Sequence, residues 1–127
     1  MPTEELVRLD IPAQPAFVGV ARAVVATVAT SVEGIDDDRL EDLRLAVSEA
    51  CTNAVEDREA GHRVVLSCLL DDDHLDVRIE DASDGFSAEA LAERGWGLQL
   101  INALVDDVSF ERADGSTSVT LRMKLED

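Results

Sequence analysis

The sequence has little of what marks a secreted or membrane-spanning protein. Its two cysteines, Cys51 and Cys68, form neither a disulfide framework nor a zinc-binding pattern. No apolar run approaches the roughly 18 residues of a membrane span. The opening stretch MPTEELVRLD carries acids where a signal peptide needs basic residues followed by apolar ones. We therefore expect a cytoplasmic protein that does not enter a membrane.

Basic residues are also scarce. Lys and Arg number 11 against 28 Asp and Glu, which leaves a formal net charge of −17 at pH 7. This charge repels phosphate backbones, so direct binding of nucleic acid is disfavoured. A basic protein partner is compatible with it, and so is a surface that is simply well solvated. A bound nucleotide would need a cation to offset the repulsion.

The residues that are abundant describe one folded domain. The chain has 127 residues, of which 46% are hydrophobic, and we assign residues 1–127 to a single domain. Hydrophobic periodicity predicts strands at 6–11, 64–70, 75–79, 108–112 and 118–125, and helices at 17–32, 36–55 and 98–105. A polar link is predicted at 87–93. This order predicts an α+β fold, a two-layer α/β sandwich whose sheet is mixed and mostly antiparallel, with the helices on one face.

Two apolar stripes identify the residues that the two long helices are expected to contribute to the core. Recurrence at three and four residues marks one face of a helix. The first stripe contains Val18, Ala21, Val25 and Ala29, and Gly34 is predicted to end that helix. The second contains Leu40, Leu43, Val47, Ala50 and Ala54. Cys68 alternates with apolar residues and is predicted to be a small core residue.

An acid and an amide lie one turn apart in the stretch SEACTNAVED. Glu49 and Asn53 are expected roughly opposite Leu43 and Val47 on the second helix. A solvated outer face is the ordinary explanation of such a pair. The alternative is chemical: an Asn oxygen is a hard, neutral ligand for Mg²⁺, and a Glu one turn earlier could accept a proton from a nearby hydroxyl.

Two further segments could contact a nucleotide. Asp81, at a strand end, could accept a hydrogen bond from an exocyclic amine such as that of adenine, and Gly85 would permit close approach of the backbone. Gly95 and Gly97 precede a predicted helix, whose free N–H groups suit phosphate, and Arg94 adds a cation. Taken singly, each segment is also explained by an ordinary turn or loop.

Taken in order, these segments resemble a known family. Glu-x-x-x-Asn, Asp-x-x-x-Gly, Gly-x-Gly-Leu and then Gly115-Ser116-Thr117 before a final strand are similar to the ATP-binding fold of gyrase, histidine kinases and MutL, the GHKL family. The resemblance covers roughly residues 40–125. The phrase LRLAVSEACTNAVE and the short chain most resemble the bacterial anti-sigma-factor serine kinases, whose layout fits the whole sequence.

The resemblance implies a role for each matching residue. Asn53 would hold Mg²⁺, and Glu49 would be the general base toward a serine hydroxyl. Asp81 would bind the adenine amine of ATP, with Gly85 and Thr117 at the adenine end. Gly95 and Gly97 would flank the phosphates. The cofactor-binding positions expected from the motifs also include Ser83, Arg94 and Leu98.

The implied function is an anti-sigma factor with ATP-dependent serine kinase activity. Its partners would be a sigma factor and an anti-anti-sigma protein of the STAS type, and the family suggests a homodimer. A second hypothesis is a binding module with a degraded nucleotide site. Ser83 stands where the family's Asp-x-Gly-x-Gly box has its first glycine, and Asp57 stands where a histidine is common; both favour it. The catalytic piece of a histidine kinase is disfavoured, because the sequence shows no upstream helical segment with a phosphoacceptor histidine.

Overall fold

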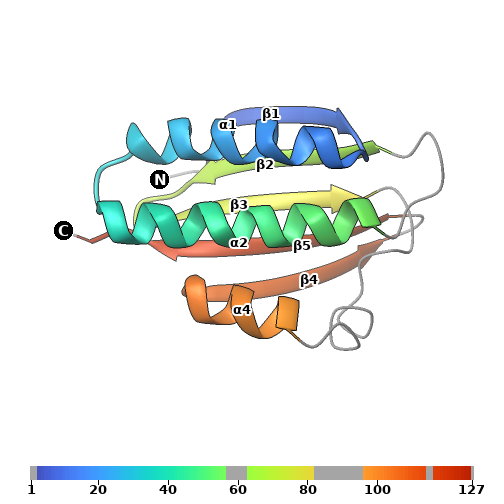
Figure 1. The fold of residues 1–127 in the computed structure, drawn as a ribbon. Coiled ribbons are helices and arrows are strands. Elements are labelled where there is room, and N and C mark those ends of the chain that lie inside the picture. The colour runs from blue at the N-terminus through green and yellow to red at the C-terminus, as the bar shows by residue number, and fades with distance from the viewer. Residues whose placement is uncertain (1–2, 57–62, 82–95, 114–115, 127) are drawn as a thin grey trace.

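The computed structural model describes residues 3–56, 63–81, 96–113 and 116–126, and these residues form two layers (Figure 1). One layer is a five-stranded sheet, and the other is a row of helices that covers one face of it. The predicted two-layer α/β sandwich with helices on one face is therefore confirmed. The polar link predicted at 87–93 lies outside the described residues.

The sheet contains strands β1 (Glu4–Pro12), β2 (Arg63–Leu70), β3 (His74–Asp81), β4 (Asp107–Ala113) and β5 (Ser116–Lys124). Their spatial order is β1-β2-β3-β5-β4. The sheet was expected to be mixed and mostly antiparallel, and all four pairings among the described strands are antiparallel. Each predicted strand is present, and its ends differ from the predicted ends by at most two residues.

Apolar and polar residues alternate along the central strands, so the sheet has one face buried under the helices and one face that no described helix covers. On the helix side, the residues of β3 and β5 are at most 2% exposed: Leu75, Val77, Ile79, Val119, Leu121 and Met123. On the opposite side, Asp76 and its cross-strand partner Arg122 form a bidentate pair, with Nε–Oδ1 and Nη2–Oδ2 distances of 2.9 and 3.0 Å. The period of two thus places apolar residues under the helices and charged residues on the open face.

Four helical segments accompany the sheet in the described chain. A 3₁₀ turn, η1 (Pro15–Phe17), leads into α1 (Val18–Thr30), so Phe17, the first residue of the predicted helix, lies in the 3₁₀ turn and not in the α-helix. The others are α2 (Asp37–Glu56) and α4 (Trp96–Leu104). In Figure 1, α1 covers β1 and β2, α2 crosses β3 and β5, and α4 lies beside β4.

The core lies between the sheet and α1 and α2. The predicted stripe of α1 is confirmed for Ala21, Val25 and Ala29, which are at most 1% exposed, whereas Val18 is only partly buried. In α2 the predicted stripe is buried too, with Leu40 partly so, and further residues join it: Ala46, Cys51, Asn53 and Val55. Contacts of α2 with α1 on one side and α4 on the other explain this wider buried arc.

Both cysteines are core residues. Cys51 is 1% exposed and Cys68 is fully buried, which confirms the prediction for Cys68. Burial raises the pKa of each thiol to about 12. Since a thiolate is the reactive form of cysteine, both side chains are protonated and inert at neutral pH.

Gly34 lies in the turn between α1 and α2; it was predicted to end the first helix, which ends earlier, at Thr30. Its φ is +101°, and its carbonyl accepts the backbone N–H of Glu126 at 3.0 Å. A Cβ at this position would lie 2.7 Å from the Glu126 carbonyl oxygen and 2.9 Å from its nitrogen. Glycine is therefore required here by backbone conformation and by the close approach of the C-terminal segment.

We expect Gly34→Ala to lower the free energy of unfolding by about 2 kcal/mol, because a side chain is strained at this φ and meets backbone atoms. Urea unfolding would measure the loss. Gly19→Ala in α1 is the matched control, since a Cβ there has no atom within 4 Å and alanine favours helix. The control should be neutral or stabilising; equal losses in both variants would contradict the assignment.

Candidate functional site

The face of α2 that carries Asn53 is not a solvated face. Asn53 is 4% exposed, and Glu49, one turn earlier, is partly buried. The solvated-face explanation is therefore wrong for Asn53. The reason is the position of α2 between two neighbouring helices, which leaves its last turns little contact with water. Buried amides need hydrogen-bond partners, so the side chain of Asn53 is held in a defined polar environment.

Asp81 and Thr117 are brought together by the register of the sheet. They are direct cross-strand partners at the end of β3 and the start of β5, and both face the helices. Asp81 is fully buried, and Thr117 is 2% exposed. Thr117 was expected just before the final strand, but it lies inside β5. The sequence gives no sign of this pairing, because it depends on β5 inserting between β3 and β4.

The three buried polar residues occupy one end of the molecule. The C-terminal half of α2, the end of β3 and the start of β5 lie at the same end in Figure 1. Asn53, Asp81 and Thr117 all take part in interactions, so none of them is without a partner. A buried carboxylate is costly unless it is hydrogen bonded. An amide, a carboxylate and a hydroxyl held at one buried end are suited to recognising a polar ligand.

A helix begins at this same end. The first turn of α4 contains Gly97 and Leu98, and the helix packs against α2. We expected both glycines to precede the helix, but Gly97 lies within it. The first N–H groups of a helix have no intrahelical partner, and the positive end of its dipole favours an anion. The start of α4 could therefore hold a phosphate, as predicted for this segment.

Several predicted site residues cannot be placed. Ser83, Gly85, Arg94 and Gly95 lie outside the described residues, as does Asp57. Val64 of β2, which no motif singled out, is 1% exposed and is the cross-strand neighbour of Asp81. Its alternating strand pattern is ordinary, and only the order of strands shows that it forms an apolar wall beside the carboxylate.

The fold and this arrangement define a class of protein. A family model described as a histidine kinase-like ATPase domain matches residues 11–123. The chain therefore belongs to the histidine kinase-like ATPase family, as the GHKL resemblance predicted.

Within this family the chain is similar to serine-protein kinases called RsbW. The Oceanobacillus iheyensis protein is 34% identical, over 91% of this chain and 84% of its own. The Bacillus subtilis protein is 32% identical, over 89% and 82%. The predicted resemblance to the anti-sigma-factor serine kinases is thereby confirmed, and the name of these relatives agrees with the predicted enzyme class.

A solved structure shares the fold. The crystal structure of the RsbU and RsbW domains of Rv1364c from Mycobacterium tuberculosis matches with a TM-score of 0.74 and 23% identity. The match covers 98% of this chain and 33% of that longer chain. It shows that the fold of this chain is a known one.

The chain offers a ligand of the right kind for Mg²⁺. Mg²⁺ usually keeps several waters and takes only one or two protein ligands beside substrate phosphates. Asn53 supplies one neutral oxygen at the buried end. Among the described residues, no group of three or more His, Cys, Asp or Glu could hold a metal by itself. A single amide ligand beside nucleotide phosphates is thus the arrangement that these residues fit.

Proposed function

We propose that this protein is an anti-sigma factor with ATP-dependent protein-serine kinase activity. It would transfer phosphate from ATP to a serine of an anti-anti-sigma protein of the STAS type, and it would sequester a sigma factor. The observation that carries the proposal is that Asn53 and the cross-strand pair Asp81 and Thr117 are buried at the same end of a member of this ATPase family.

Each site residue would have a defined task. The Asp81 carboxylate would accept a hydrogen bond from the adenine amine, beside Thr117, and this would select adenine over guanine. Asn53 would supply its oxygen to the metal, and the first N–H groups of α4 would bind phosphate oxygens. Bound Mg²⁺ would neutralise phosphate charge, which matters in a chain with a net charge of −17. Glu49 would accept the proton of the attacking serine hydroxyl.

The partners follow from the same proposal. Sigma factor and STAS-type protein would dock as proteins, in the cytoplasm and without direct contact with nucleic acid. A homodimer is part of the proposal, as the family suggests. No helix in the described part of the chain is long and apolar enough to cross a membrane. The alternative is a binding module without transfer, which Ser83 and Asp57 favour.

We expect Asn53→Ala to weaken ATP binding by roughly 10- to 100-fold in Mg²⁺, because a lost bond to a charged group costs a few kcal/mol. In EDTA the loss should be under about threefold, since no metal is then bound. Isothermal titration calorimetry in the two buffers measures both values. Thr52→Ala, at the neighbouring position of α2, is the control for altered packing. Equal losses in both buffers would make Asn53 structural, and no binding by the unaltered protein would favour the binding module.

A further inference from the structure

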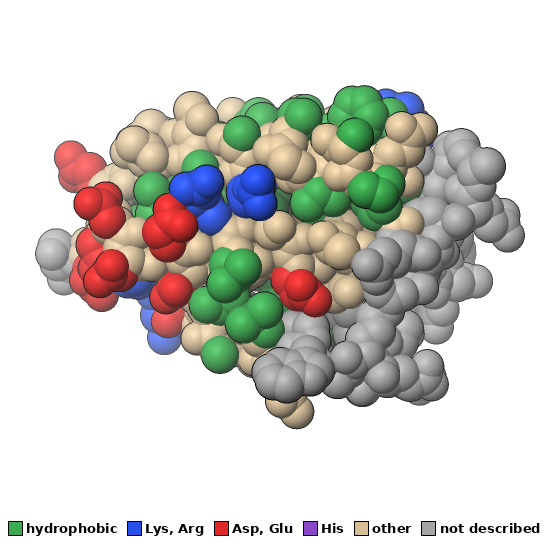
Figure 2. Space-filling view, in the orientation of Figure 1, with side chains coloured by type: hydrophobic (Ala, Val, Ile, Leu, Met, Phe, Trp, Pro, Cys, Tyr) green, Lys and Arg blue, Asp and Glu red, His purple; other side chains and the backbone are tan. Residues whose placement is uncertain are grey.

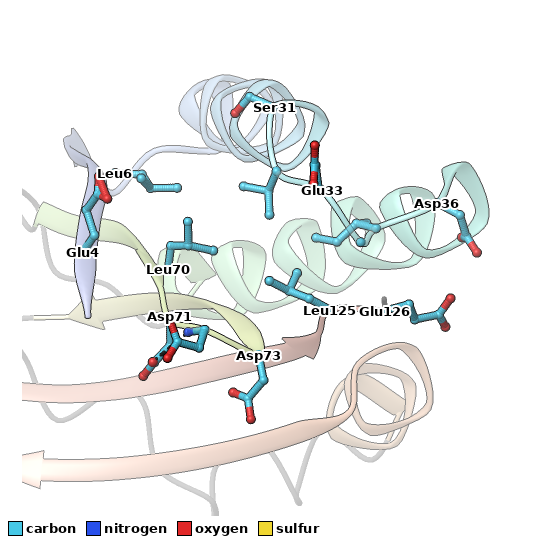
Figure 3. Close-up of a pocket in the computed structure, with 14 residues that line it drawn as sticks. Glu4, Leu6, Ser31, Glu33, Asp36, Leu70, Asp71, Asp73, Leu125 and Glu126 are labelled. Carbon is cyan, nitrogen blue, oxygen red and sulfur yellow. Dashed lines mark hydrogen bonds between the residues drawn. The ribbon is translucent and has the colours of Figure 1, made fainter. Parts of the chain in front are cut away.

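A hollow of about 940 Å³ lies at the end of the molecule opposite the candidate nucleotide site. Its walls are the start of β1, the turn between α1 and α2, the turn between β2 and β3, and the segment after β5 (Figure 3). Asp81 is at the far end of β3 from this hollow, and Asn53 is at the far end of α2. A molecule bound here would therefore not compete with a nucleotide.

The floor of the hollow is apolar. Figure 3 shows Leu6, Leu70 and Leu125 directed into the space between the strands and the α1–α2 turn. Val32 and Ile35 line it from that turn, and all five side chains are only partly buried. Partly exposed apolar residues from four segments form a continuous surface that has not been closed over by the described chain. Such surfaces are typical of interaction sites.

The rim of the hollow is acidic on every side. Seven acids line it, and none of the lining residues is Lys or Arg: Glu4, Glu33, Asp36, Asp71, Asp72, Asp73 and Glu126. Figure 2 shows acidic side chains gathered at this end of the helical face. Concentration of one sign of charge around a recess focuses the field there and attracts a group of the opposite sign.

Some of these acids have structural tasks. Asp36 Oδ1 accepts the backbone N–H of Arg39 at the start of α2. Asp71 accepts the backbone N–H of Asp72 and the Thr3 hydroxyl, and these bonds lower its pKa. Arg39 Nη1 lies 3.8 Å from Glu126 Oε1, and His74 Nδ1 lies 2.6 Å from Asp73 Oδ1. These contacts account for the positions of four acids.

Two further acids of the rim, Glu4 and Glu33, have no such task. Glu4 and Glu33 are exposed, and neither forms a side-chain hydrogen bond or an ion pair with any residue in the described ranges. Among the described residues that line the hollow, no Lys or Arg offsets the charge of these two side chains.

We propose that this hollow, which we call the acidic groove, binds a short basic amphipathic segment of a partner protein. One or two large apolar side chains would fill the floor, and flanking Lys or Arg side chains would pair with the rim. The volume is within the range of ligand sites, and complementary charge would give fast and specific association.

Other occupants fit the groove less well. The phosphate groups of a nucleic acid, or a free phosphate, would be repelled by the seven carboxylates of the rim. A divalent cation would not use the apolar floor, and the described residues contain no group of acids with the geometry to hold a metal. A second copy of this chain would bring a net charge of −17 against the same rim. The segment must therefore be both cationic and apolar.

The test uses fluorescence anisotropy with a labelled peptide of Leu and Lys, about 12 residues or three helical turns long. A second peptide replaces Leu by Ser at the same charge. We expect saturable binding of the Leu/Lys peptide and at least about tenfold weaker binding of the Ser/Lys peptide, a difference of about 1.4 kcal/mol. Equal affinities, or no binding of either peptide, would overturn the proposal.

Charge reversal in the groove supplies the second arm. The double variant Glu33→Lys with Asp72→Lys should weaken the Leu/Lys peptide at least about tenfold. Asp107→Lys with Glu111→Lys, at exposed positions of β4, makes the same change of charge elsewhere and should alter affinity less than about threefold. Equal losses would reveal non-specific attraction and overturn the assignment to the groove.

Two measurements separate the other outcomes. Both double variants should retain the Mg-ATP affinity of the unaltered protein, which shows that they are folded and that the nucleotide site is separate. Ca²⁺ should release the peptide only at concentrations where simple salt screening also does so. If Ca²⁺ releases it at concentrations far below the NaCl concentration that is needed, the rim is a cation site and the proposal is overturned. A change of oligomeric state in the groove variant alone, seen by analytical ultracentrifugation, would assign it to a second copy.

Discussion

Glu49→Gln is expected to lower phosphoryl transfer to a STAS-type protein by roughly 10²- to 10⁴-fold, the usual contribution of a general base. Glutamine keeps the shape and hydrogen bonding of the side chain but cannot accept a proton. ATP affinity should change by less than about threefold, because in our proposal Glu49 acts on the acceptor hydroxyl and not on the nucleotide. Single-turnover transfer from labelled ATP, together with calorimetry, separates the two quantities.

Asp42→Asn is the matched control for this prediction. Asp42 lies two turns earlier on the same side of α2, is partly buried like Glu49, and undergoes the same change from acid to amide. Transfer by this variant should remain close to that of the unaltered protein. Unchanged transfer by Glu49→Gln would remove Glu49 from the mechanism, whereas equal losses in both variants would point to a general effect of charge on α2.

Asp81→Asn should weaken ATP binding by about 10- to 100-fold, since a buried charged acceptor is lost and an amide cannot replace all its hydrogen bonds. The preference for ATP over GTP should shrink as well. An Asn side chain can donate to the carbonyl of guanine, which a carboxylate cannot do. Calorimetric titration with both nucleotides gives the two affinities and their ratio.

The same strand provides the control for Asp81. Asp76 is a nearly buried acid of β3 on the opposite face, where it pairs with Arg122. Asp76→Asn should lower the unfolding midpoint, because the bidentate pair is weakened, without changing the ratio of ATP to GTP affinity. A constant ratio in the Asp81 variant would contradict its role at adenine, even if overall affinity fell.

Much of the fold could be predicted because local chemistry specifies it. The period of two in β3 and β5 reflects one face under helices and one face open. The spacing of Ala21, Val25 and Ala29 gave the buried side of α1, and Gly34 gave the turn after it. In each case the pattern spans only a few residues. Over that distance the geometry of a helix or strand fixes the face on which each side chain lies.

The candidate site was predictable in part. The types and order of residues around Glu49, Asn53 and Asp81 identified the family without a structure. The environment of Asn53 could not be predicted, because its burial depends on α1 and α4, which flank α2 from distant parts of the chain. Likewise Thr117 was placed before the last strand, since its pairing with Asp81 follows from the strand order.

The sequence by itself determined the class of fold, the family and the sign of the net charge, and it supplied the residues that our proposal assigns to nucleotide binding. The tertiary structure decided which of them share a buried end and where acids surround an apolar floor. Helical and strand periods act over a few residues, so they can be read along the chain. Strand order and helix packing join residues far apart in sequence, and Glu4, Glu33, Asp72 and Leu125 line one groove only after the sheet and helices have assembled.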